Sequence, residues 1–215
     1  MTVQTILRET LIWIELLAAL IAVWHWPNLK ESHWKWFVVY LGVIFMVEAF
    51  SKWGLKNQPT HRVNLYDFFG IPIQFLFFYW LYAVKSLKNY GLFWISIAIY
   101  GLSFLPYFTL FNKEGIVFSL SYTVGNVLLL LMVFLEIFKQ IKSEKILLFR
   151  SNFMFYINIG ITLFYIGTLP FFSFYGLILK DLTFWTSYYI FFMIANHIMY
   201  VLFICAFVWG KPNTY

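Results

Sequence analysis

Two carboxylates, Glu48 and Asp67, lie in otherwise apolar stretches. Their position makes them the leading candidates in this sequence for binding a ligand or a proton. They flank a short polar turn around Pro59 that joins two hydrophobic stretches. Burying a charged side chain in hydrocarbon costs roughly 2.5 kcal/mol or more, so an acid in such a stretch is a candidate site for a ligand or a proton.

The ionisation of this pair has two alternative outcomes. If Glu48 and Asp67 face one another, repulsion between two carboxylates keeps one of them protonated near neutral pH. If Lys52 and Arg62 fold back onto the pair, both acids are ionised and the cluster is structural. The spacing Glu48–Lys52 suits such a pair on one helix face.

Further polar groups recur at helical spacing in apolar stretches. Asn64, Asp67 and Gln74 are expected on one helix face, and that face must contact protein or water rather than lipid. Glu136, by contrast, stands among lysines and is expected to be a solvated interfacial charge. His197 is either a hydrogen-bonded packing residue or a residue that binds a ligand or carries a proton. The ligand- or proton-binding candidates are therefore Glu15, Glu48, Asn64, Asp67, Gln74, Asn126, Asn196, His197 and Tyr200.

The elements that must position these residues are membrane helices. Of the 215 residues, 62% are hydrophobic and 11% are charged, which is typical of a polytopic membrane protein. A membrane-spanning helix needs about 20 apolar residues. We therefore predict an all-α protein with a single seven-helix transmembrane domain over residues 1–215, and a break in the sixth helix at Gly167 and Pro170. The predicted spans are 5–26, 33–53, 63–84, 90–111, 116–139, 152–177 and 183–209.

Basic residues predict the orientation. Nine follow the odd-numbered helices, namely Lys30, Lys35, Lys85, Lys88, Lys139, Lys142, Lys145, Arg150 and Lys211. Six lie on the other side, namely Arg8, Lys52, Lys56, Arg62, Lys113 and Lys180. The positive-inside rule then places the N-terminus outside and the C-terminus in the cytoplasm, as a multi-pass protein of the bacterial inner (cytoplasmic) membrane.

Several classes of chemistry have no motif in the sequence. There is no P-loop, GxGxxG, HExxH or GxSxG pattern and no metal-ligand spacing, so we expect no cofactor and no metal. Cys205 is the single cysteine, which excludes an intramolecular disulfide. The span 183–209 contains no lysine, so a retinal Schiff base is not expected. The net charge of +6 reflects sidedness, and we expect no nucleic-acid partner.

The partners implied are the lipid bilayer and, through two weaker signals, a ligand and a protein. Aromatic residues make up 24% of the chain and could form a cage for a lipophilic or small-molecule ligand. An AT-rich genome explains this content more simply, because it enriches Phe, Ile, Tyr, Asn and Lys together. The basic loop 139–150 could dock a protein partner at the cytoplasmic side, or could reflect only the positive-inside bias and attraction to anionic lipid.

One resemblance covers the whole chain. The pattern of Glu15, Asn64–Asp67, Asn126, Asn158 with Leu169-Pro170-Phe171, and Asn196 resembles small seven-helix inner-membrane proteins that are common in Bacteroidota genomes. The resemblance implies a topology and no activity.

Three functions follow from these expectations. We favour a ligand-binding sensor or an accessory subunit whose polar pocket opens outward and whose output passes to a partner protein. The alternative is a small proton-coupled transporter or channel that uses Glu15, Glu48, Asp67 and His197. A membrane-embedded lipid enzyme is weaker, because the sequence has no nucleophile–base pair at recognisable spacing.

Overall fold

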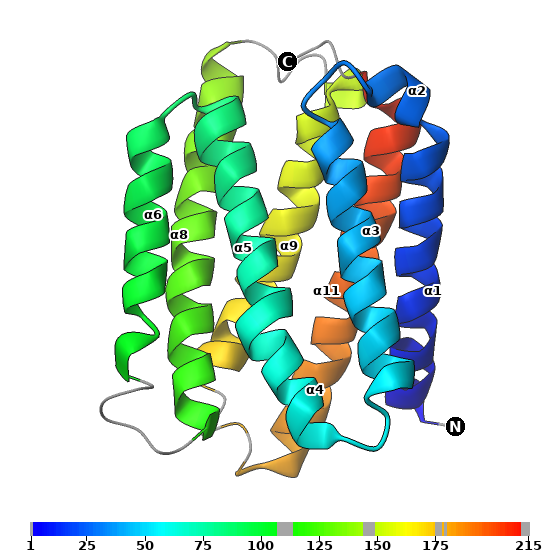
Figure 1. The fold of residues 1–215 in the computed structure, drawn as a ribbon, viewed down its shortest axis with the longest axis vertical. Coiled ribbons are helices and arrows are strands. Elements are labelled where there is room, and N and C mark those ends of the chain that lie inside the picture. The colour runs from blue at the N-terminus through cyan, green and yellow to red at the C-terminus, as the bar shows by residue number, and fades with distance from the viewer. Residues whose placement is uncertain (1, 107–113, 144–148, 175–177, 179, 212–215) are drawn as a thin grey trace.

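The computed structural model describes residues 2–106, 114–143, 149–174, 178 and 180–211, and Figure 1 shows their arrangement. Those residues form helices without a β-strand, which confirms the predicted all-α class for the described part of the chain. The elements are α1 (Val3–Trp24), α2 (Trp26–Leu29), α3 (Lys35–Ala49), η1 (Phe50–Gly54), α4 (Pro59–Leu65), η2 (Tyr66–Gly70), α5 (Ile71–Tyr79), η3 (Trp80–Ser86), α6 (Tyr90–Leu102), α8 (Glu114–Lys142), α9 (Phe153–Ser173) and α11 (Leu182–Trp209), with η marking π-helical turns.

Polar side chains at the helix N-termini determine where several of these helices begin. The Asn89 side chain accepts a hydrogen bond from the Leu92 amide at the start of α6, at 2.9 Å. Asn152 and Asp181 cap α9 and α11 in the same way. Each cap satisfies a backbone donor that the first helical turn leaves unpaired, so these turns are stable at the ends of apolar helices.

Five helical segments are long and apolar enough to cross a membrane, namely Lys35–Gly54, Pro59–Ser86, Leu120–Lys142, Phe153–Ser173 and Leu182–Trp209. Each overlaps one of the predicted spans. The other two predicted spans correspond to α1, which carries Arg8, Glu9 and Glu15, and to α6, which has 13 residues. The structure therefore has the helices expected of an integral membrane protein.

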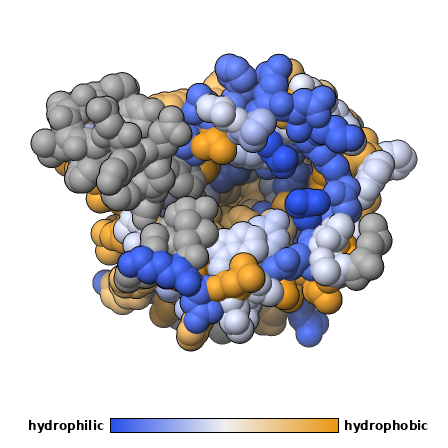
Figure 2. Space-filling view, turned by 90° about the horizontal axis from the view of Figure 1, so that it is seen from below, coloured by the Kyte–Doolittle hydropathy of each residue, from blue (hydrophilic) through white to orange (hydrophobic). Residues whose placement is uncertain are grey.

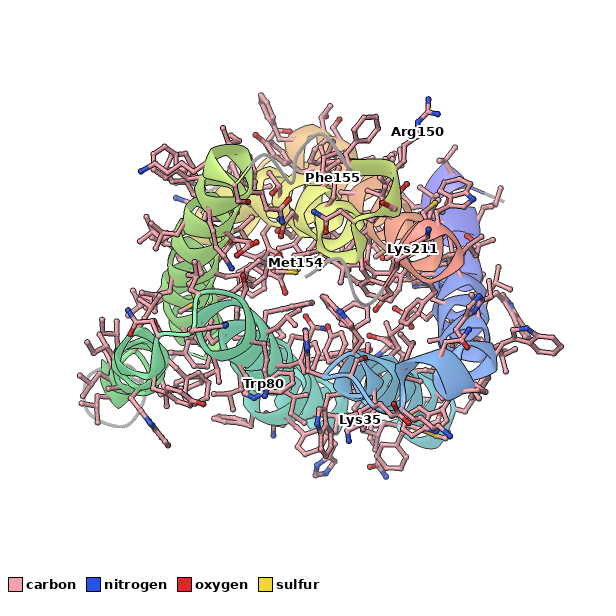
Figure 3. All side chains as sticks on the ribbon, turned by 90° about the horizontal axis from the view of Figure 1, so that it is seen from above. Lys35, Trp80, Arg150, Met154, Phe155 and Lys211 are labelled. Atoms are coloured by element: carbon pink, nitrogen blue, oxygen red, sulfur yellow. The ribbon has the colours of Figure 1, made fainter. Side chains whose placement is uncertain are left out.

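A ring is formed by α1, α3, α5, α8, α9 and α11, and α6 lies outside it (Figure 3). Around the ring, α1 packs on α3 and α11, α11 packs on α9, α9 packs on α8, and α8 packs on α5. Stacking of Tyr40 on Phe77, with ring centroids 4.3 Å apart, joins α3 to α5 and closes the ring. The outer faces carry exposed apolar side chains such as Trp13, Leu131 and Phe134, as lipid contact requires.

The predicted break at Gly167 and Pro170 does not occur, because α9 continues to Ser173 with Pro170 inside it. Packing against α8 and α11 holds this helical turn although proline removes one backbone donor. Gly167 has a packing role instead: a β-carbon there would collide with the Phe191 ring of α11. The two helices can therefore approach closely at this level.

An aromatic cluster fills the ring at the end where α3 and α9 begin and α11 ends. Its members are Trp34, Phe37, Phe153, Phe203 and Phe207, all at most 3% exposed. The Trp34 and Phe153 ring centroids are 4.3 Å apart, and those of Phe37 and Phe203 are 5.1 Å apart. We call this cluster the aromatic plug, since its rings occupy the interior at one end of the bundle.

A buried polar network lies at the same end and corrects the expectation that Glu136 is solvated. The Glu136 carboxylate is 0% exposed. It accepts hydrogen bonds from Ser86 Oγ and from Gln140 Nε2, the latter at 3.0 Å, and Lys139 Nζ donates to the Ser86 carbonyl at 2.6 Å. Asn152 Nδ2 donates to Gln140 Oε1 at 3.3 Å. This polar clamp joins η3, α8 and the start of α9, so Glu136 faces the neighbouring helices instead of water.

Candidate functional site

A cavity of about 540 Å³, which we call the inner chamber, lies inside the ring toward the end where α1 begins. Residues of η2, α5, α9 and α11 form most of its wall, so segments distant in sequence meet there. Its lining consists of Glu48, Val63, Tyr66, Asp67, Ile71, Gln74, Tyr122, Phe164, Phe171, Phe172, Trp185, Tyr189, Phe192 and Asn196.

A second cavity of about 510 Å³, the outer chamber, adjoins it and shares Glu48, Tyr66, Tyr189, Phe192 and Asn196 with its lining. Its remaining lining is largely polar and charged, with Arg8, Glu9, Leu11, Ile12, Lys52, Trp53, Lys56, Arg62 and Met193. Figure 2 shows this end of the molecule hollowed at its centre, with hydrophilic residues around part of the rim. The two chambers therefore lie side by side in the hollow at the end where α1 begins.

Glu48 lies at the boundary between the chambers. Tyr66 of η2 donates a hydrogen bond from its hydroxyl to Glu48 Oε2 at 2.7 Å. Lys52 does not form the expected helix-face pair with Glu48, because its ammonium binds Glu9 of α1 at 2.7 Å. Lys52 and Arg62 remain within electrostatic range of Glu48. Glu48 is thus held by a phenol at the chamber wall while its basic neighbours lie at the rim.

Asp67 and Gln74 line the inner chamber with Ile71, but Asn64 is exposed and is not part of either lining. The π-helical turn Tyr66–Gly70 explains the difference, because a π turn holds more residues than an α turn and rotates what precedes it. Of the three residues predicted on one helix face, Asp67 and Gln74 therefore face the chamber and Asn64 does not. Gln74 Oε1 accepts a hydrogen bond from the Tyr165 hydroxyl at 3.4 Å.

The acid that interacts electrostatically with Glu48 is Glu15 of α1. Asp67, in contrast, is within electrostatic range of Tyr100 of α6. Glu15 is 3% exposed, and its Oε2 has no hydrogen-bond partner within the described part of the chain. Glu15 lies near the hydroxyl of Tyr200, which is also buried. Glu48 therefore has Glu15 as an acidic neighbour, while Asp67 lines the same inner chamber.

Asn196 and His197 are adjacent in α11, but Asn196 lines the chambers whereas His197 contacts α1. Asn196 lines both chambers, and its buried Oδ1 has no hydrogen-bond partner among the described residues. His197 Nδ1 donates to the Met193 carbonyl at 2.7 Å, and its Nε2 lies 3.0 Å from Thr10 Oγ1 of α1. His197 therefore joins α11 to α1, which agrees with the packing interpretation.

Asn126 of α8 is fully buried away from both chambers. Its Nδ2 donates to the Tyr165 carbonyl of α9 at 3.0 Å, while its Oδ1 has no partner in the described part of the structure. The Tyr79 hydroxyl donates to the carbonyl of the preceding residue, Gly125, at 2.8 Å. Asn126 thus belongs to the contacts that hold α5, α8 and α9 together.

The aromatic wall of the inner chamber was not predicted from the sequence. Trp185, Tyr189, Phe192 and Asn196 follow one another at intervals of four, three and four residues, which places them on one face of α11. The signal was present, but the many aromatic residues elsewhere in the chain hid it. The predicted docking loop 139–150 includes residues 144–148, which lie outside the described residues.

Comparison of the chain with protein-family models, curated proteins and solved structures finds no match.

Proposed function

We propose that the chain is a seven-helix integral membrane protein, a single domain with its N-terminus outside, that binds a small ligand in the two-chamber cavity. In this proposal α1 and α6 also cross the membrane, and the cavity opens to the outside. The protein acts as a sensor or an accessory subunit, and ligand binding is transmitted to a partner protein. No nucleic acid, metal or cofactor takes part.

One observation carries this proposal: among the described residues, the interior is hollow toward the end where α1 begins and filled by side chains at the other end. The inner and outer chambers share five lining residues and lie toward the end where α1 begins. At the opposite end the aromatic plug and the polar clamp occupy the ring. A blind cavity suits the capture of a ligand better than continuous conduction, and apolar walls with a few polar groups are typical of small-molecule sites.

Cysteine labelling tests the cavity and its direction. Cys205→Ala provides a background without thiols, into which Ile71→Cys places a thiol on the inner chamber. In right-side-out vesicles, a membrane-impermeant methanethiosulfonate is expected to label Ile71→Cys at least tenfold faster than Leu129→Cys, whose side chain is fully buried. Leu131→Cys, which faces lipid, is the second control.

The outcomes separate the parts of the proposal. Labelling of Ile71→Cys from the cytoplasmic side alone would overturn the orientation. Labelling at the rate of Leu129→Cys from both sides would overturn the open cavity.

A proton-coupled transporter is the second candidate function, because ionisable groups continue beyond the inner chamber. Glu15 lies next to Glu48, and Tyr200 and Tyr40 lie within electrostatic range of Glu15. Such a series could accept and pass a proton in a structure that alternates between two openings. Liposomes containing the purified protein and a pH-sensitive dye would show no proton flux if this candidate is wrong.

A further inference from the structure

We propose that the inner chamber binds a protonated organic amine carried on an apolar or aromatic body. This inference rests on the proposed function, since it names the chemical class of ligand for the same cavity. It follows from the charges, the rings and the hydrogen-bond acceptor that the chamber wall brings together.

The charge of the wall favours a cation. Glu48 and Asp67 both line the inner chamber, and among the described residues its lining includes no lysine or arginine. Glu15 adds a third acid within electrostatic range of Glu48. Carboxylates at membrane depth need a compensating positive charge or a proton, because the surroundings solvate the ionised form poorly. An ammonium group supplies that charge inside the chamber.

The rings of the wall favour the same ligand. Tyr66, Trp185, Tyr189 and Phe192 line the chamber, as do further aromatic side chains of α8 and α9. Trp185 and Tyr189 stack with centroids 5.0 Å apart and an interplanar angle of 10°. Aromatic faces attract cations through their quadrupole, and the attraction reaches about 2 kcal/mol where water is excluded. The same rings provide an apolar surface for the body of the ligand.

The amide of Asn196 favours an amine that keeps an N–H group. Asn196 lines the chamber, and its buried Oδ1 has no hydrogen-bond partner in the part of the chain that the structure describes. Oδ1 is turned away from the open space, so a ligand donor reaches it after the amide turns over about its Cβ–Cγ bond, and the contact then removes the cost of an unpaired buried acceptor, about 1–3 kcal/mol. A protonated primary, secondary or tertiary amine carries such a donor, whereas a quaternary ammonium does not.

The four basic residues of the outer chamber, Arg8, Lys52, Lys56 and Arg62, oppose a cation at the rim more than inside the inner chamber, although Lys52 and Arg62 also act electrostatically on Glu48. The Lys52 ammonium binds Glu9 at 2.7 Å, and Arg8 Nε lies 3.9 Å from the same carboxylate. The Arg8 and Glu9 side chains are 59% and 44% exposed, so salt screens them at the rim. The acids of the inner chamber lie deeper, where screening by salt is weaker. A cation therefore gains electrostatic stabilisation as it passes from the rim to the chamber.

Three compounds with one body test the class: 4-phenylbutylamine, 4-phenylbutan-1-ol and 4-phenylbutanoate. Radiolabelled forms are titrated at pH 7 onto the full-length protein in phosphatidylcholine nanodiscs, with empty nanodiscs subtracted. We expect saturable binding of the amine at least tenfold tighter than of the alcohol, and weaker binding of the carboxylate. Glu48→Gln and Asp67→Asn should each weaken amine binding about tenfold, equal to about 1.4 kcal/mol. Both should leave alcohol binding within about twofold of its original value.

Glu31→Gln is the matched control, because it removes one negative charge from an exposed position outside the cavity linings. It should leave amine binding unchanged.

Alcohol binding equal to amine binding, or tighter carboxylate binding, would overturn the amine class and leave the cavity in place. If none of the three binds while Ile71→Cys is labelled from outside, the amine class is likewise wrong. Absence of both binding and labelling would overturn the proposed function as well. Asp67→Asn tests the charge independently where Glu48→Gln does not fold.

Discussion

Glu136→Ala is expected to lower the thermal stability of the protein strongly, although Glu136 is distant from the cavity. Its carboxylate is 0% exposed and accepts hydrogen bonds from Ser86 and from Gln140. Each buried polar group that loses its partner costs about 1–3 kcal/mol. The melting temperature is measured in detergent from the fluorescence of a dye that does not react with thiols.

Two control variants test whether the lost hydrogen bonds cause the lower melting temperature. Glu136→Gln retains one oxygen acceptor, so its melting temperature should fall between those of the original protein and of Glu136→Ala. Glu31→Ala removes an exposed acid and should melt like the original protein. Equal melting temperatures for Glu136→Ala and Glu31→Ala would show that the polar clamp does not stabilise this end of the bundle.

Gly125→Ala is the second substitution with a large expected effect. A β-carbon at Gly125 of α8 would lie 2.7 Å from the Phe75 ring and 2.9 Å from the Tyr100 ring. Both rings are held in contact with other rings of the core, Phe75 by Tyr165 and Tyr100 by Tyr79, so they cannot move aside freely. Overpacking of this kind costs about 1–3 kcal/mol and should be visible as a lower melting temperature.

Gly42→Ala and Gly101→Ala are the matched controls for this prediction. Both positions are helical, and a β-carbon at either would meet no atom within 4 Å. In a helix interior, where Gly42 lies, alanine is more favourable than glycine by roughly 0.5–1 kcal/mol, so Gly42→Ala should melt at the same temperature or slightly higher, and Gly101→Ala, in the last turn of α6, should melt like the original protein. A melting temperature of Gly125→Ala at or above that of Gly42→Ala would show that the bundle adapts to the added methyl group.

Much of the fold could be predicted because apolar length and helix ends are local properties. Each predicted span overlaps a helix, and the polar residues Asn89, Asn152 and Asp181 lie where helices begin. The break at Pro170 was predicted wrongly, since the local preference of proline was overridden by packing of α9 against α8 and α11. Local propensity is reliable only where neighbouring helices do not impose the conformation.

The candidate site was predictable only in part, because register and partners are decided by neighbours. The sequence shows four polar residues inside apolar stretches, and all four line the inner chamber: Glu48, Asp67, Gln74 and Asn196. Asn64 was placed with them by α-helical spacing, but the π-helical turn Tyr66–Gly70 changes that spacing. A π turn leaves no simple signature in composition or periodicity.

The amino-acid sequence by itself determined that this protein is helical, apolar enough for a membrane and supplied with acids inside its apolar stretches. Only the tertiary structure decided which groups those acids meet. Lys52 binds Glu9 rather than Glu48, Glu48 neighbours Glu15, and Glu136 is buried among η3, α8 and α9. The physical reason is that hydropathy acts along each helix, whereas hydrogen bonds and ion pairs form across helices. The rotation of each helix about its axis, which sets those contacts, follows from the packing of the whole ring.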